Sequence, residues 1–157
     1  MTDKVKFYTR LTQQITALSG PDIHWLSTLA NTTALLWLEL EDINWVGFYL
    51  AKNDQLILGP FQGNPACTHI AIGQGVCGSA FAEKTIFRVS DVHQFPGHIA
   101  CDAASQSEIV LPLYTGSQLI GVLDIDSPSI NRFDGQDEAG LAELLVQLSD
   151  HLSEIEF

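Results

Sequence analysis

Hydrophobic residues recur at helical spacing in three segments of the chain. The first repeat ends at Gly20 and Pro21, where a helix must break. Pro21 also suits the first turn of a second helix, and Asp134 is a good N-cap for a third because acidic residues follow it. Each helix carries an apolar stripe that another layer must cover. The stripes are Val5, Tyr8, Leu11, Ile15 and Leu18; then Ile23, Leu26, Ala30, Trp37 and Leu40; then Leu141, Leu144, Leu145, Leu148 and Leu152.

Between the second and third helices the hydrophobic period changes to two, which is typical of β-strands. Two hairpins are expected, one turning at residues 52–54 and the other at Thr115 and Gly116. Residues 89–107 contain Pro96 and Gly97 and show no clear period, and so long a loop in a compact domain is usually functional or disordered. The predicted strands are residues 44–50, 55–58, 68–72, 109–114 and 118–126.

This order of elements predicts an α+β fold. A central, mainly antiparallel sheet would carry the N- and C-terminal helices packed on one face. The chain has 157 residues, of which 46% are hydrophobic and 17% charged, so it can bury a sizeable core and is not expected to be disordered. No repeat or linker divides it, and we expect a single domain over residues 1–157.

The charge balance narrows the possible partners. The chain has 19 acidic and 7 basic residues and a formal net charge of −12, which disfavours nucleic acids and anionic membrane surfaces. The polar start of the chain does not have the form of a signal peptide, and the most apolar stretch, residues 35–40, is too short to span a membrane. We therefore expect a cytoplasmic location, where stable structural disulfides are not expected.

Three cysteines then need another explanation: Cys67, Cys77 and Cys101. A buried cysteine is commonly only a small hydrophobic residue. Cys67 and Cys101, however, lie in expected loops, the second near His98 and polar residues, while Cys77 follows glycines at an expected helix start. Loops let another thiol approach a thiolate, so this placement favours reactive cysteines.

The acidic residues are the second signal. Asp124 and Asp126 share one face of a strand, and the second hairpin should place Glu108 next to Asp124. Such a cluster must bind cations, share protons or lie open to water. A solvated sheet edge is the alternative, but Ile120 and Val122 precede the acids on the same face, which favours a partly apolar pocket for a ligand with an ammonium group.

Other candidate chemistry is less specific. Trp45 and Tyr49 share a strand face and could be core residues or aromatic walls for a thioether or sulfoxide methyl group. The histidines His69, His93 and His98 show no metal-ligand spacing with the cysteines, and we expect no metal site. Residues 73–78 have the letters GxGxxG but lack the βαβ context of a phosphate-binding loop.

Taken together, these segments resemble the GAF-domain free methionine-(R)-sulfoxide reductases. The similarity extends over nearly the whole chain, and the block around Cys101 together with Cys67 is specific to the reductases, whereas the strand and helix pattern alone would indicate only a GAF domain. The motifs are NWVGFY (44–49), LGPFQGNPAC (58–67), GQGVCG (73–78), FPGHIACD (95–102), SQSEIV (105–110) and GVLDIDSP (121–128).

The resemblance implies a reaction and a set of roles. The chain would reduce free L-methionine-(R)-sulfoxide, with Cys101 as the nucleophile and Cys67 as the resolving cysteine that closes a disulfide with it. Cys77 matches a third family cysteine, counted with the catalytic group as an auxiliary in recycling. Substrate binding would involve Trp45, Tyr49, Glu108, Asp124 and Asp126. The family further implies no bound cofactor, thioredoxin as the external reductant, and a homodimer.

Two other functions remain open at this stage. A ligand-sensing GAF module would bind a small molecule without chemistry, but its cysteines would then have no role and a phosphate ligand would be repelled by the acids. A peroxide sensor or general thiol oxidoreductase would use the cysteines without stereoselectivity toward a sulfoxide. Counting free thiols before and after methionine sulfoxide separates the enzyme, which loses two, from the sensor, which loses none.

Overall fold

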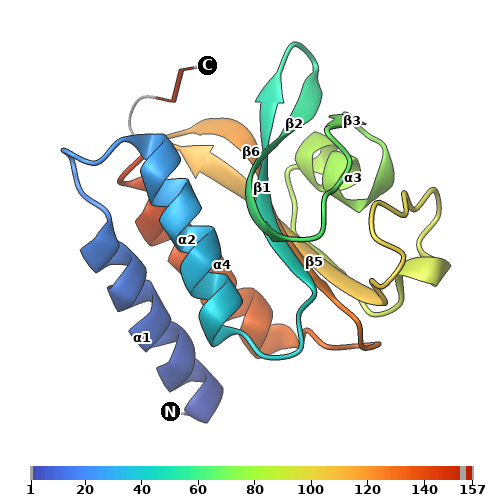
Figure 1. Cartoon of the computed structure of the whole chain (residues 1–157), viewed down its shortest axis with the longest axis horizontal. Coiled ribbons are helices and arrows are strands. Elements are labelled where there is room, and N and C mark those ends of the chain that lie inside the picture. Colours follow the sequence, from blue (N-terminus) through green and yellow to red (C-terminus); the bar gives the residue numbers. More distant parts are fainter. Residues whose placement is uncertain (1, 153–154, 157) are drawn as a thin grey trace.

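A six-stranded sheet forms the centre of the molecule (Figure 1). The computed structural model describes residues 2–152 and 155–156. The strand order is β3-β2-β1-β6-β5-β4, and all neighbouring strands pair antiparallel, as predicted. The strands are β1 (Trp45–Lys52), β2 (Gln55–Gly63), β3 (His69–Ala71), β4 (Phe87–Val89), β5 (Ser107–Thr115) and β6 (Gln118–Ser127), and the helices are α1 (Asp3–Leu18), α2 (Trp25–Glu39), α3 (Gly75–Glu83) and α4 (Gly135–Ser149).

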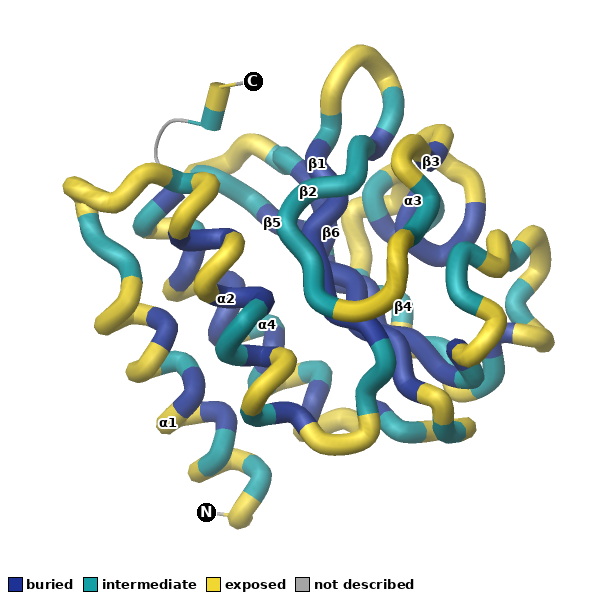
Figure 2. Tube along the Cα trace, viewed as in Figure 1, coloured by how far each residue is buried: buried dark blue, intermediate teal, exposed yellow. Residues whose placement is uncertain are grey.

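Helices α1, α2 and α4 lie on one face of the sheet, and α3 lies on the other (Figure 1). The predicted packing of the N- and C-terminal helices on one face is therefore confirmed. The buried residues of Figure 2 run through the strands and the sheet-facing sides of these helices. Among the described residues, no helix is long and apolar enough to cross a membrane.

The last helix follows the sequence closely. The side chain of Asp134 caps α4 by accepting hydrogen bonds from the backbone N–H groups of Gln136 and Asp137. The Asp137 carboxylate in turn accepts a hydrogen bond from the Asp134 backbone N–H, which completes a capping box. All five leucines of its predicted stripe are buried. The cap and the stripe agree with each other, and the helix begins where the sequence predicts.

The second helix, α2, differs most from the sequence prediction. Pro21 does not start it: α2 begins at Trp25 with His24 as its N-cap. The predicted stripe is largely exposed, and the buried face is instead formed by Thr28, Leu29, Thr32, Thr33 and Leu36. Threonine is a polar residue, but the hydroxyls of Thr32 and Thr33 donate to backbone carbonyl oxygens about one turn earlier, so these two side chains can face the core. The hydrophobic pattern therefore pointed to the wrong face.

A bulge moves Ile120 away from the acidic face. The β5–β6 ladder shifts register between Leu113 and Tyr114, and a bulge changes the face to which neighbouring side chains point. Glu108 pairs directly with Asp126, and its carboxyl group also lies close to that of Asp124, as predicted. Ile120 packs into the core under the helices, not on the acidic face. The segment without a clear period contains a short 3-10 helix over Val92–Gln94, and strand β4 ends at its first residue, Val89; the sequence predicted neither element.

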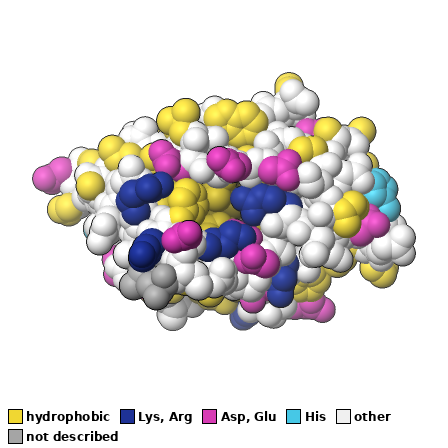
Figure 3. Space-filling view, turned by 90° about the horizontal axis from the view of Figure 1, so that it is seen from below, with side chains coloured by type: hydrophobic (Ala, Val, Ile, Leu, Met, Phe, Trp, Pro, Cys, Tyr) yellow, Lys and Arg dark blue, Asp and Glu magenta, His cyan; other side chains and the backbone are white. Residues whose placement is uncertain are grey.

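Asp137 ties α1 to the rest of the fold. Its carboxylate is 1% exposed and accepts bonds from Tyr8 Oη at 2.7 Å, Lys4 Nζ at 2.8 Å and Arg132 at 3.3 Å. Arg132 also donates to the Glu41 carbonyl oxygen. Figure 3 shows the face near this cluster, where basic and acidic side chains alternate around an apolar hollow despite the acidic net charge.

We predict that Asp137→Asn destabilises the fold by about 3 kcal/mol, because the buried carboxylate and its charge-assisted bonds to Lys4 and Arg132 are lost. Urea unfolding followed by circular dichroism measures the change. Glu143→Gln on the exposed side of the same helix is the control, and its free energy of unfolding should stay within about 0.5 kcal/mol of the parent protein. Equal stability of the two variants would contradict the role assigned to Asp137.

Candidate active site

The face of the sheet away from the three long helices carries the site. Strand β1 alternates between two cores, so Trp45 and Tyr49 point to this face. Their rings stack with centroids 5.8 Å apart, and Phe61 stacks on Trp45 at 5.3 Å. Gly47 lies between Trp45 and Tyr49 on strand β1, and a Cβ atom at this position would come within 2.5 Å of both Phe61 Cβ and the Trp45 ring. The glycine thus makes room for the aromatic wall.

Three acids form the floor. Glu108 comes from β5, and Asp124 and Asp126 come from the adjacent β6, with Glu108 directly opposite Asp126. The three residues are only 6%, 6% and 9% exposed. Among the described residues, the Oδ1 atoms of both aspartates are buried without a hydrogen-bond partner. The predicted acidic cluster therefore exists, and it is a buried floor, not a solvated edge.

Burial governs the protonation of this floor. It raises the pKa of Glu108, Asp124 and Asp126 well above their ordinary values, and the neighbouring carboxylates raise them further. Burial likewise raises the pKa of the Cys77 thiol, with Asp124 and Glu108 adding to the effect. These buried carboxyl groups therefore stay protonated at pH values at which a carboxyl group in water would be ionised.

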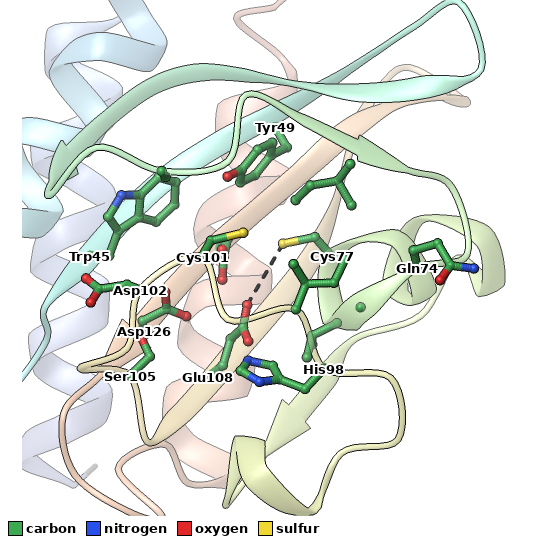
Figure 4. A pocket seen from close by; sticks show the side chains of 16 residues that line it. Trp45, Tyr49, Gln74, Cys77, His98, Cys101, Asp102, Ser105, Glu108 and Asp126 are labelled. Carbon is green, nitrogen blue, oxygen red and sulfur yellow. Dashed lines mark hydrogen bonds between the residues drawn. The ribbon is translucent and has the colours of Figure 1, made fainter.

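The cysteines divide into a bonded pair and a free thiol. Cys67 and Cys101 form a disulfide, with their Cα atoms 5.4 Å apart, although 34 residues separate them. Cys77 is free and buried at the start of α3, and its Sγ atom donates to Glu108 Oε1 at 3.9 Å. Figure 4 shows Cys77 and Cys101 on neighbouring sides of one space above Glu108.

A cavity of about 40 Å³ lies between these groups. Such a volume holds an ion or a few water molecules. Tyr49 closes one side, because its hydroxyl donates to the Cys67 carbonyl oxygen at 2.9 Å. No lysine or arginine is among the residues that line the cavity, which include His98, Cys101, Asp102 and Ser105 besides the aromatic and acidic residues above.

Asn44 fastens the Cys101 loop to the sheet. Its side-chain Nδ2 donates to Asp102 Oδ2 and to Ser105 Oγ, both at 3.1 Å. Asp102 Oδ1 accepts from the Ala104 backbone N–H, which fixes the turn after Cys101. Ser105 and Asp126 both line the cavity, so the loop and the acidic floor meet there.

The structure brings the sequence-predicted residues together. Seven of them line the cavity, and Cys67 joins them through its bond to Cys101. The seven are Trp45, Tyr49, Cys77, Cys101, Glu108, Asp124 and Asp126. Of the three histidines considered, only His98 lines the cavity. Sequence reasoning missed Asn44, Asp102 and Ser105 as contributors, although all three fall within the quoted motifs.

Comparison with known proteins gives one family. A model described as "GAF domain" matches residues 26–153. The chain is 53% identical over 155 residues to a protein of Escherichia coli (strain K12) named free methionine-R-sulfoxide reductase, covering 99% of this chain and 94% of that protein.

Solved structures agree with this likeness. The free methionine-R-sulfoxide reductase of Neisseria meningitidis in complex with its substrate superposes with a TM-score of 0.91 at 42% identity, over 97% of this chain and 92% of the other. The substrate complex of fRMsr of Staphylococcus aureus gives a TM-score of 0.88 at 50% identity, over 92% of this chain and 95% of the other.

The Asn44 contacts predict a change in disulfide stability. Asn44→Asp replaces a donor by a carboxylate facing Asp102, so the closed loop should be disfavoured and the Cys67–Cys101 disulfide reduced more readily. We expect its reduction potential to rise by about 30 mV, measured by glutathione redox titration with thiol alkylation.

The reciprocal double variant is the control. Asn44→Asp combined with Asp102→Asn lets the amide at position 102 donate to the carboxylate at position 44, which should bring the potential back toward that of the parent protein. A potential unchanged by Asn44→Asp alone would show that these bonds do not hold the loop closed.

Proposed function

The chain belongs to the GAF-domain family of free methionine-R-sulfoxide reductases, and from this premise we propose that it reduces free L-methionine-(R)-sulfoxide with Cys101 as the attacking thiolate. The observation that carries the proposal is the Cys67–Cys101 disulfide at the edge of a cavity floored by buried acids. A nucleophilic and a resolving cysteine must be able to meet, and the binding pocket must lie beside them.

The proposed reaction has three steps. The Cys101 thiolate attacks the sulfoxide sulfur, while one carboxyl group of Glu108, Asp124 or Asp126 protonates the oxygen. The protonated oxygen then passes to the Cys101 sulfur as its bond to the substrate sulfur breaks, and the bond between the two sulfurs also breaks. Methionine leaves with a new lone pair on sulfur, and Cys101 becomes a sulfenic acid. The Cys67 thiol then attacks that sulfenic sulfur, which releases water and forms the disulfide. An external dithiol, in our proposal thioredoxin, reduces the disulfide and returns two thiols.

The acidic floor explains a preference for the free amino acid. A free amino acid has an α-ammonium group that can pair with a carboxylate of the floor, whereas a peptide-bound methionine has a neutral amide at that position. The stacked Trp45 and Tyr49 rings provide an apolar wall suited to the methyl end of the substrate. In this arrangement the two ends of the ligand are recognised by different chemistry.

Entry of the substrate requires the disulfide to open. The cavity of about 40 Å³ is too small for methionine sulfoxide, and Cys101 lies in a loop whose residues 99–100 and 103–104 are exposed. Reduction would free this loop from Cys67, leaving the Asn44 bonds as its remaining tie near Cys101. We infer that the described state is the closed, oxidised end of the cycle.

Other parts of the assignment are proposals from the family alone. These are a homodimer, a cytoplasmic location, the absence of a bound cofactor, and recycling by thioredoxin with Cys77 as an auxiliary. One observation fits a homodimer: the outer side of α2 and the turn before it expose the apolar residues Ile23, Leu26 and Trp37. An apolar surface of this kind is suited to contact with another protein surface.

The thiol chemistry has a direct test. Exposure of the reduced protein to free methionine-(R)-sulfoxide should consume two free thiols per chain, and an NADPH-coupled assay with thioredoxin and thioredoxin reductase should show turnover. Cys101→Ser should lower kcat/KM by at least about a thousandfold, because no other thiolate replaces the nucleophile. Cys67→Ser should still release methionine once but stop at the sulfenic acid. Turnover by Cys101→Ser at the native rate would refute the proposal.

The proposed pairing between the acidic floor and the substrate ammonium group is tested by comparing free with N-acetylated methionine sulfoxide. N-acetylation removes the positive charge of the substrate, so kcat/KM should fall by about a hundredfold relative to the free amino acid. Glu108→Gln should narrow this difference by weakening turnover of the free form more than that of the acetylated form. Asp102→Asn serves as the matched control, because it removes a cavity-lining acid outside the floor and should preserve the preference. Equal use of both substrates by the parent protein would contradict the pairing.

A further inference from the structure

Three side chains from three different elements converge beneath Cys101. Cys77 lies on α3, Glu108 on β5 and Asp124 on β6. One potential ligand atom of each lies within 4.8 Å of the other two, and all three residues are buried. The sequence predicted the two acids as neighbours but not the addition of Cys77, because the three residues are separated by 31 and 16 positions and match no metal-ligand spacing.

One carboxyl oxygen of this group is buried without a hydrogen-bond partner in the described part of the chain. Among the described residues, Asp124 Oδ1 has no hydrogen-bond partner, and neither has Asp126 Oδ1 beside it. The Cys77–Glu108 contact at 3.9 Å is at the long end of a sulfur hydrogen bond. No lysine or arginine lines the cavity. A buried acid needs either a proton or a cation to offset its lost solvation, and a bound cation would occupy these oxygen atoms.

We propose that Cys77, Glu108 and Asp124 form a binding site for a thiophilic divalent cation such as Zn²⁺. Zinc takes thiolate sulfur at about 2.3 Å and carboxylate oxygen at about 2.0 Å in a tetrahedron, which places sulfur and oxygen about 3.5 Å apart. The observed separation of 3.9 Å needs only a small adjustment. On binding, Cys77 loses its proton to solvent, and water or Asp126 completes the coordination.

The cation would be a competitor of the substrate, not a cofactor of the reaction. The same carboxylates are proposed to receive the α-ammonium group, so the two cations exclude each other. This consequence rests on the proposed function, whereas metal binding itself does not. The small closed cavity admits an ion but not the amino acid, so the oxidised protein can retain the metal after its substrate has left.

Cobalt provides the test, because a cobalt–thiolate bond gives a charge-transfer band in the near ultraviolet. The background is the full chain with Cys67→Ser and Cys101→Ser, in which Cys77 is the remaining thiol. Titration with Co²⁺ should produce the band at one ion per chain, and Zn²⁺ should remove it by displacement. Adding Cys77→Ser should abolish the band and weaken Zn²⁺ binding at least tenfold. Zn²⁺ should also raise the melting temperature of the background protein but not that of the Cys77→Ser variant.

Control variants distinguish specific metal binding at this site from nonspecific attraction of cations to the acidic cavity. Asp124→Asn should weaken Zn²⁺ binding at least tenfold, while Asp102→Asn, an equal change of charge in the same cavity, should alter it less than threefold. Free methionine sulfoxide should displace Co²⁺ competitively. A missing cobalt–thiolate band, or one that survives Cys77→Ser, would overturn the site, and failure of methionine sulfoxide to displace the ion would overturn the competition. Metal binding by a protein without reductase activity would refute the proposed function while leaving the site intact.

Discussion

Three carboxyl groups and a thiol are buried at one place with no lysine or arginine among the described residues that line it, and this constraint shapes the site. Removing a charged carboxylate from water is unfavourable unless a cation, a proton or a set of hydrogen bonds replaces the lost solvation. Glu108, Asp124 and Asp126 are therefore stable here as protonated acids or as partners of a cation. Both states serve the proposed reaction, because a protonated acid can donate to the sulfoxide oxygen and a carboxylate can hold the ammonium group.

The scaffold can carry this unfavourable group because the two faces of the sheet do different work. The core beneath α1, α2 and α4 contains twenty buried residues, and Asp137 secures α1 through Lys4, Tyr8 and Arg132. The opposite face has the smaller core and receives the site. Because strand residues alternate between faces, Ile109 and Ile125 enter the large core while the adjacent Glu108 and Asp126 enter the site. Stability gained on one face thus offsets the cost of buried acids on the other.

Local sequence patterns predicted the structure correctly wherever the residue types and the hydrophobic period indicated the same element. The leucine stripe of α4 and its Asp134 cap, the two hairpins, and the common face of Asp124 and Asp126 all follow from short-range rules. Prediction failed where a polar residue occupied a core position, as with Thr32 in α2, or where one bulge turned Ile120 to the other face. The Asn44 contacts were beyond reach because they join positions 58 and 61 residues apart. The pairing of Cys67 with Cys101 came from family resemblance, since spacing alone cannot choose among three cysteines.

In the proposed reaction, the Cys67–Cys101 disulfide links the oxidation state of the protein to the space above the acids. With Cys67 and Cys101 joined, the loop is held by a covalent bond and by Asn44, and the space above the acids is limited to about 40 Å³. In the proposed reaction, a ligand as large as an amino acid must therefore leave before the disulfide closes the loop. Closure also removes water from the floor, which strengthens the electrostatic demand for a small cation or a proton there. In this proposal the two features of the site act together. The Cys67–Cys101 disulfide limits the size of ligand that can enter the cavity, and the acidic floor selects ligands that carry a positive charge.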